Sequence, residues 1–156
     1  MLKRSPVQVK SLQPHQVRSK LLISGLNWWA ESSGRIRRHD KVLNALFPAL
    51  QICADNGRDW PPPVLCIGPE SDFARLFGGK IVNDLVHDSH GYLQVRETRQ
   101  PVIEFVRSRP VDMGQDRVWV SYERLIVPGN LSSSRELYLV LNQIERVLRD
   151  VDVISS

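Results

Sequence analysis

Two adjacent charged residues, Glu123 and Arg124, have side chains suited to chemistry and lie inside the apolar stretch WVSYERLIVP. A carboxylate acts as a general base only when a second group orients it and a pocket holds the substrate. The stretch is typical of a strand, and neighbours along a strand point to opposite faces of the sheet. Because the two side chains cannot share one constellation, the pattern favours a structural ion pair across the sheet, and no catalytic residue is predicted.

A second candidate is the pair of histidines in VHDSH, His87 and His90, which are three residues apart. On a helix this spacing places both rings on one face, where Asp84 and Asp88 could complete a metal site. The alternative is a polar helix end that breaks at Gly91. We favour the helix end, so no metal site is predicted.

The remaining reactive groups show no catalytic pattern. Cys53 and Cys66 have no metal-ligand spacing and are interpreted as two buried thiols on neighbouring strands of a protein in a reducing compartment. The chain contains no GxSxG, no HExxH and no phosphate-binding glycine loop. An enzyme using Glu123 or His87 is therefore the weakest hypothesis.

The first element that could position these groups is a helix over residues 17–31. Apolar side chains recur there at helical spacing and form two adjacent rows. This pattern predicts an amphipathic helix that packs on the sheet or on a second copy. Because two rows are wider than one monomer face needs, we expect a homodimer. The residues assigned to its seam are Leu21, Leu22, Trp28 and Trp29.

The elements after this helix alternate between strands and short helices. LQICADNG and VLCIG predict two strands, PESDFARLFGG predicts a helical turn, and the segment up to Pro101 predicts one interrupted helix or two short ones. VIEFVRSRP and RVWVSYERLIVP then predict a hairpin around the turn MGQD, with Pro128 ending its second strand. Residues 137–151 stay open, because LYLVL suits a last strand while the spacing of 137, 141, 144 and 148 suits a helix.

Positive charge gathers near the N-terminus. Residues 1–41 hold nine Lys and Arg against Glu31 and Asp40, although the whole chain is only +4. A basic region can attract nucleic acid or an acidic partner surface. The basic patch Arg35, Arg37 and Arg38 is the candidate contact, with a solvated surface as the favoured alternative, so nucleic-acid binding is not expected.

Several segments resemble the sequence pattern of a known protein family. They are LNWWAESSGRIRRHDKVLNALFPAL, VLCIGPESDFARLFGGKIVNDL, LQVRETRQPVIEF and YERLIVPGN. The chain resembles a group of small bacterial stand-alone PAS-domain proteins over roughly residues 26–141. After VPGN the family pattern implies a final strand, so we expect a strand over 137–142 and a helix or tail from Ile144.

The resemblance implies an α+β fold, with a PAS-like antiparallel five-stranded sheet, short helices on one face and an N-terminal amphipathic helix. One PAS-like domain would cover 17–143, between a basic flexible arm at 1–16 and a C-terminal helix or tail at 144–156. Some PAS domains hold haem through a helix histidine, which makes His87 the residue to test; no cofactor is otherwise indicated. The residues expected to line a ligand cavity are Phe73, Phe77, Leu85, Phe105, Trp119 and Tyr122.

These features lead to one main functional hypothesis and one alternative. The main hypothesis is a non-enzymatic sensory or regulatory domain that signals through a small-molecule ligand or a protein partner. The alternative is an adaptor or DNA-binding regulator acting through the basic N-terminal region. No apolar run approaches the roughly 18 residues of a membrane helix and no export signal is seen, so a cytoplasmic location without membrane contact is expected.

Overall fold

The computed structural model describes residues 8–58, 60, 62–78, 90–108, 110–114, 117–131 and 136–149. Within them no helix has the length and apolar character needed to cross a membrane. The elements in chain order are β1 (Gln8–Ser11), η1 (Pro14–Gln16), α1 (Lys20–Ser32), α2 (Lys41–Leu46), η2 (Phe47–Ala49), β2 (Gln51–Ala54), β3 (Val64–Ile67), α3 (Asp72–Phe77), α5 (His90–Thr98), β4 (Val102–Arg107), β5 (Val111–Asp112), β6 (Arg117–Asn130) and β7 (Glu136–Arg149).

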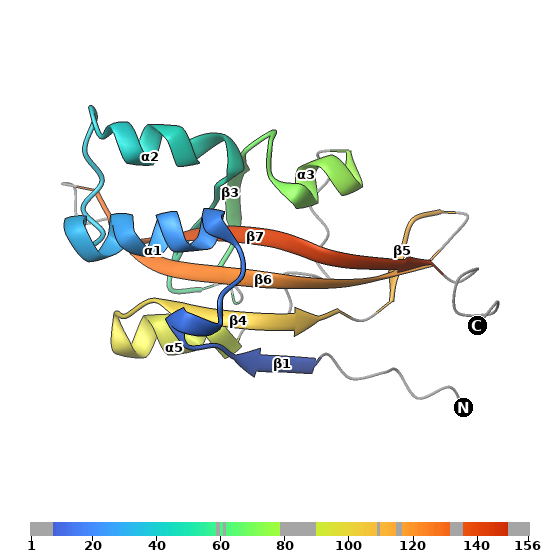
Figure 1. Cartoon of the computed structure of the whole chain (residues 1–156). Helices are drawn as coiled ribbons and strands as arrows, with labels where there is room; N and C mark the ends of the chain where they lie inside the picture. The colour runs from blue at the N-terminus through green and yellow to red at the C-terminus, as the bar shows by residue number, and fades with distance from the viewer. Residues whose placement is uncertain are drawn as a thin grey trace.

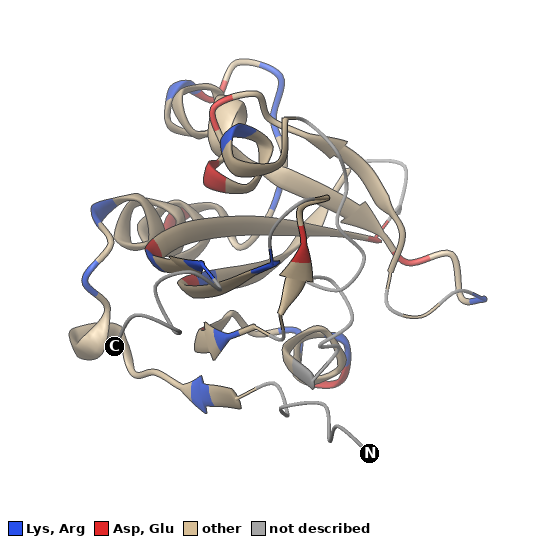
Figure 2. Cartoon of the chain, turned by 90° about the vertical axis from the view of Figure 1, so that its right-hand side faces the viewer, with Lys and Arg blue, Asp and Glu red and all other residues tan. Residues whose placement is uncertain are grey.

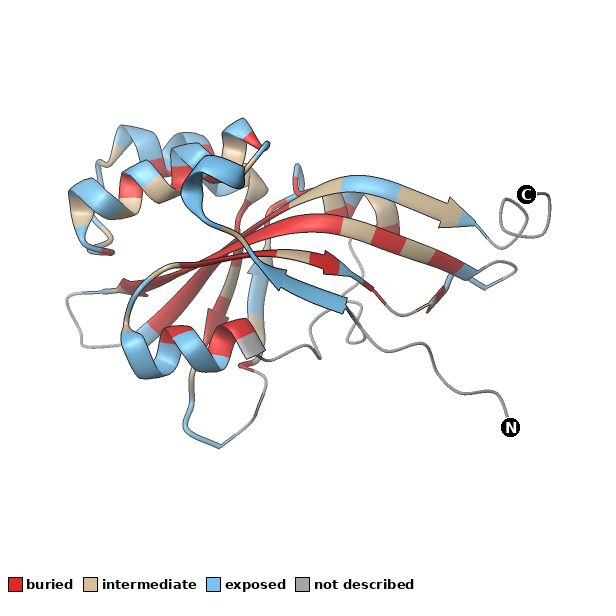
Figure 3. Ribbon diagram, turned by 60° about the horizontal axis from the view of Figure 1, so that its bottom comes forward, coloured by how far each residue is buried: buried red, intermediate tan, exposed pale blue. Residues whose placement is uncertain are grey.

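The described strands form one seven-stranded antiparallel sheet. Its order is β1-β4-β6-β7-β2-β3, and the short β5 pairs with β6. The α+β class is confirmed, but five strands is wrong because β1 and β5 add to the sheet. The expected arm at 1–16 is wrong for residues 8–11, which pair with β4 from Gln8↔Arg107 to Ser11↔Glu104. Figure 3 shows β1 exposed at the sheet edge and the burial concentrated in the central strands.

The long pair β6 and β7 forms the centre of the sheet, and β6 does not stop at Pro128. The strand continues to Asn130, still paired with β7. The Pro128 carbonyl accepts a hydrogen bond from Trp29 Nε1 (3.2 Å), on the side away from β7. Because the nitrogen of a strand residue points the same way as its carbonyl, no ladder bond to β7 is lost at this proline.

β7 answers the question left open for the C-terminal segment. Residues 137–142 form the expected strand, but the helix or tail expected from Ile144 is wrong as far as Arg149, where β7 ends. Leu141 packs in the cluster around α1, whereas Ile144 packs beside Phe73. The three-residue separation alone places these two side chains on opposite faces of the strand. The register shift comes after Ile144, between Ile144 and Arg146, and Val147 then packs in the same cluster as Ile144. The helix-like spacing therefore combined residues from opposite faces of one long strand.

Helix α1 lies on the sheet of its own chain. Ser19 caps it by accepting a hydrogen bond from the Leu22 amide (3.2 Å), so the helix begins later than the expected residue 17. Leu22 and Trp28 are buried in the core formed with β6 and β7. Leu21 and Trp29 are half-buried against the same core. The assigned dimer seam is therefore largely used inside the monomer.

Helices lie on both faces of the sheet, which corrects the expectation of one face. Leu125 and Val127 pack in the cluster around α1 and α2, whereas Ile126, between them on β6, packs in the cluster around α5. This alternation follows from the two-residue period of a strand. Figure 1 shows α1 and α5 on opposite sides of β4 and β6.

Candidate functional site

A row of three buried polar residues crosses the sheet on the face covered by α5. Glu104 of β4, Arg124 of β6 and Asn142 of β7 occupy paired register positions, so their side chains share one face. Arg124 Nη2 lies 3.1 Å from Glu104 Oε2, and each side chain is only 2% exposed. We call these three residues the polar row. The expected ion pair across the sheet is confirmed for Arg124, with Glu104 rather than Glu123.

Aromatic rings and a glycine surround the polar row. The Arg124 guanidinium lies 5.3 Å from the Tyr92 ring centroid and 5.8 Å from that of Tyr122, within the range of cation–π attraction. Gly91, in the first turn of α5, lies directly over Glu104, and a Cβ there would overlap Glu104 Oε1. The glycine thus lets α5 close over the carboxylate.

Two buried oxygens of the polar row have no hydrogen-bond donor among the described residues. They are Glu104 Oε1 and Asn142 Oδ1. A buried polar atom without a partner costs roughly 1–3 kcal/mol, so such atoms usually meet a donor. The row therefore offers two acceptor oxygens to a group with N–H or O–H donors.

Beside the row, burial keeps two reactive groups neutral. Burial raises the pKa of Tyr92 well above its ordinary value, and burial also raises the pKa of the Cys53 thiol. Gln51 Nε2 lies 3.4 Å from the Tyr92 hydroxyl and 3.5 Å from Cys53 Sγ. At neutral pH the thiol is not a thiolate, so it does not provide a nucleophile. Cys66 is exposed on β3, which corrects the expectation of two buried thiols.

The sheet end near α5 carries a second tyrosine contact. The Tyr138 hydroxyl donates to Asp55 Oδ2 (3.2 Å), and Arg96 Nε lies 3.2 Å from the same oxygen. Burial, followed by the Asp55 charge, raises the pKa of Tyr138 to about 12. The phenol therefore stays protonated at neutral pH and holds β7 to the loop after β2.

Glu123 lies on the opposite face and supports the start of α1. Its carboxylate accepts hydrogen bonds from the backbone amides of Arg18 (3.1 Å to each oxygen) and Ser19 (2.9 Å). The start of a helix has amides without partners, and a carboxylate there also suits the helix dipole. The hydrogen bonds thus give Glu123 a structural role, which is to hold the start of α1 against β6.

Glu123→Ala is expected to lower the free energy of unfolding by about 2–3 kcal/mol, because it leaves the buried Ser19 amide and the partly buried Arg18 amide without an acceptor. Denaturant unfolding at neutral pH measures this loss. Glu145→Ala is the control: it removes the exposed Arg18–Glu145 pair, whose side chains are 83% and 44% exposed, and should cost at most about 0.5 kcal/mol. Equal losses in the two variants would contradict the role given to Glu123.

The six residues expected to line one ligand cavity do not lie together in the structure. Phe73, Phe77 and Tyr122 form one cluster with β5 and β6, and the Phe73 and Tyr122 ring centroids are 4.8 Å apart. Phe105 and Trp119 are only half-buried and lie outside that cluster, and Phe105 shares the face of Glu123. Leu85 and His87 lie outside the described residues. The buried polar side chains of the sheet gather instead around Glu104, a residue that was not predicted from the sequence.

The basic patch lies beyond the C-terminal end of α1. Arg35, Arg37 and Arg38 are all exposed. Arg35 and Arg37 line a concavity of about 450 Å³ together with Ser32, Ser33 and Asn130. Figure 2 shows Lys and Arg on separate elements with Asp and Glu among them, so the basic residues do not form one continuous stripe.

One acidic residue follows the basic patch directly. The pKa of Asp40 is lowered, mainly by the hydrogen bond from the Leu43 amide and more weakly by the Arg37 charge. Asp40 also accepts a hydrogen bond from Trp28 Nε1 (2.6 Å). The carboxylate therefore fixes α2 against α1 and offsets part of the positive charge of the patch.

The described residues contain no group of three or more His, Cys, Asp and Glu that could hold a metal ion. Comparisons of the chain with protein families, curated proteins and solved structures found no match.

Proposed function

We propose that the chain is a non-enzymatic sensory or regulatory domain whose polar row recognises a small molecule rich in hydrogen-bond donors. The observation that carries the proposal is the pair of buried acceptor oxygens, Glu104 Oε1 and Asn142 Oδ1, beside the Arg124–Glu104 ion pair. Because Gly91 closes over Glu104 Oε1, a donor group would reach the two oxygens only when α5 moves away from the sheet. Its arrival or departure would change how α5 packs on the polar row.

A PAS-like assignment is part of this proposal. In support of it, β2 and β3 precede a segment with short helices, and β4, β6 and β7 follow as an antiparallel run. This is the chain order that the resemblance implies. The edge strand β1 and helix α1 precede that unit.

Energetics favour a functional role for the ion pair. Moving two charges out of water costs several kcal/mol, and their attraction often fails to exceed that cost. Well-packed apolar residues would stabilise the same position at least as well. A buried pair whose carboxylate keeps one oxygen, Glu104 Oε1, without a donor among the described residues therefore suggests recognition rather than stability.

The test compares the wild type with a double variant, Glu104→Leu with Arg124→Met. Native mass and absorbance of the freshly purified proteins would reveal a retained molecule, and a thermal-shift screen of polyols, amino acids and amines would find an exchangeable one. A ligand at 100 times its dissociation constant stabilises the folded state by about 2.7 kcal/mol. We expect a response in the wild type that the double variant lacks. A wild type with no retained mass and no response, or equal responses in both proteins, would contradict the proposal.

In this proposal the domain passes its signal to a protein partner. A cytoplasmic location stays a prediction. A homodimer also stays a prediction, with a changed surface. Because Leu22 and Trp28 are in the monomer core, a second copy would meet exposed residues of α1 such as Ile23 (39% exposed). Native mass measured for the retained-ligand test reports the oligomeric state as well.

A second candidate function, an adaptor that binds an acidic or phosphate-bearing partner, is favoured by the concavity between Arg35 and Arg37. Its strength should fall as salt rises, since phosphate contacts release counterions. Retention on duplex DNA and on an acidic peptide column at low salt would support it, if Arg35→Ala with Arg37→Ala abolishes retention. No retention of the wild type at low salt would end this alternative.

A further inference from the structure

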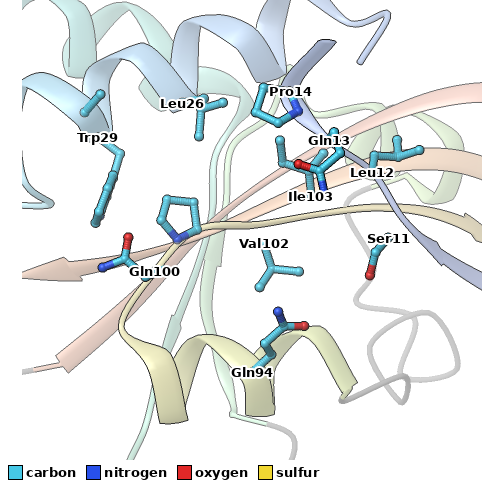
Figure 4. A pocket seen from close by; sticks show the side chains of 12 residues that line it. Ser11, Leu12, Gln13, Pro14, Leu26, Trp29, Gln94, Gln100, Val102 and Ile103 are labelled. Carbon is cyan, nitrogen blue, oxygen red and sulfur yellow. The ribbon is translucent and has the colours of Figure 1, made fainter. Parts of the chain in front are cut away.

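A second cavity lies at the edge of the sheet, where β4 begins and the chain leaves β1. Its volume is about 360 Å³. Figure 4 shows Trp29 and Leu26 reaching towards it from α1 and Gln94 from α5, with Val102 and Ile103 of β4 between them. We call it the edge cavity. Its walls come from helices that cover opposite faces of the sheet.

The described residues that line the edge cavity carry no charged side chain. None of its described lining residues is Asp, Glu, Lys, Arg or His, although 24% of the chain is charged. The polar side chains are three glutamines, Gln13, Gln94 and Gln100, together with Ser11. An amide offers both donors and acceptors. Trp29 Nε1 already donates to the Pro128 carbonyl (3.2 Å), so the ring contributes apolar surface.

From this lining we propose that the edge cavity binds an uncharged, planar molecule that carries an amide or a similar donor–acceptor group. The volume lies in the range of small-molecule sites, which are mostly apolar with a few polar groups. An ionised ligand would lose water without gaining a counter-ion here. The ligand's ring would pack on Trp29 and the apolar residues of β4, and its polar group would reach Gln94 or Gln100. The proposal does not rest on the sensing role of the polar row.

Nicotinamide and nicotinate test the proposal, because they share one ring and differ in charge at neutral pH. Each is titrated into the ¹⁵N-labelled full chain up to about 10 mM, enough to detect a dissociation constant near 1 mM. We expect nicotinamide to shift the Trp29 indole resonance and the side-chain amides of Gln94 and Gln100, and nicotinate to leave them in place. Absence of shifts with nicotinamide, or equal shifts with nicotinate, would overturn the proposal.

A pair of isosteric variants then locates the binding. Gln94→Glu puts a negative charge into the edge cavity and should weaken nicotinamide binding about tenfold. Gln8→Glu makes the same change on exposed β1, outside the lining residues, and should leave the affinity unchanged. Both side chains are exposed, so neither change threatens the fold. Equal affinities in the two variants would place the binding elsewhere and reject the edge cavity.

Discussion

Replacing Arg124 with methionine is expected to lower the free energy of unfolding by about 3–5 kcal/mol, the usual cost of breaking a buried ion pair from one side. Arg124 and Glu104 are each 2% exposed, so water cannot replace the lost guanidinium. The change also removes the cation from the rings of Tyr92 and Tyr122. Chemical denaturation measures the effect as a lower midpoint at an unchanged slope.

Two comparisons separate the buried charge from other causes. The double variant, Glu104→Leu with Arg124→Met, removes both charges and should be clearly more stable than Arg124→Met alone. Glu136→Gln disrupts the ion pair between Glu136 and Arg99, whose side chains are 52% and 40% exposed, and should change stability by less than about 0.5 kcal/mol. If the double variant loses as much as Arg124→Met, then lost packing rather than an isolated carboxylate destabilises the single variant.

The separation of Glu123 from Arg124 could be predicted from the sequence, because a strand needs only its two-residue period to place neighbours on opposite faces. The residues that Glu123 and Arg124 contact could not be predicted from the sequence. Glu104 lies 20 positions from Arg124, and the register between β4 and β6 decides that they meet. The visible signal was a carboxylate in the middle of VIEFV, because a charge between apolar strand residues has to find a partner if it points inward.

The edges of the sheet were harder to predict than its centre. β1 is exposed at all four residues, so no apolar pattern distinguishes it from a tail, and its pairing with β4 alone defines it. The turn at Gly57 and the helix end at Gly78 could be predicted, because the local chemistry of glycine at positive φ is enough there. The features that could not be predicted from the sequence, such as β1, therefore depend mostly on pairing between distant segments rather than on local preference.

Gly34→Ala is expected to lower the free energy of unfolding by about 2–5 kcal/mol, the sum of a backbone strain and a steric clash. Gly34 has a φ of +81°, where an L side chain costs roughly 1–2 kcal/mol. A Cβ there would also overlap the carbonyl oxygen of Pro128, and overpacking adds about 1–3 kcal/mol. That carbonyl cannot move freely, because it accepts a hydrogen bond from Trp29 Nε1. Two residues further along β6, the Asn130 amide donates to the Gly34 carbonyl (2.9 Å), which also holds the loop in place.

Gly57→Ala is the control that carries the backbone strain without the steric clash. Gly57 has a similar φ of +73°, but a Cβ there would meet nothing within 4 Å, so only the roughly 1–2 kcal/mol of strain is expected. The difference between the two variants in thermal or denaturant unfolding then measures how firmly the end of α1 is held against β6. A difference near zero would mean that the Gly34 loop yields easily, and that Arg35, which follows it, is not held in a fixed position.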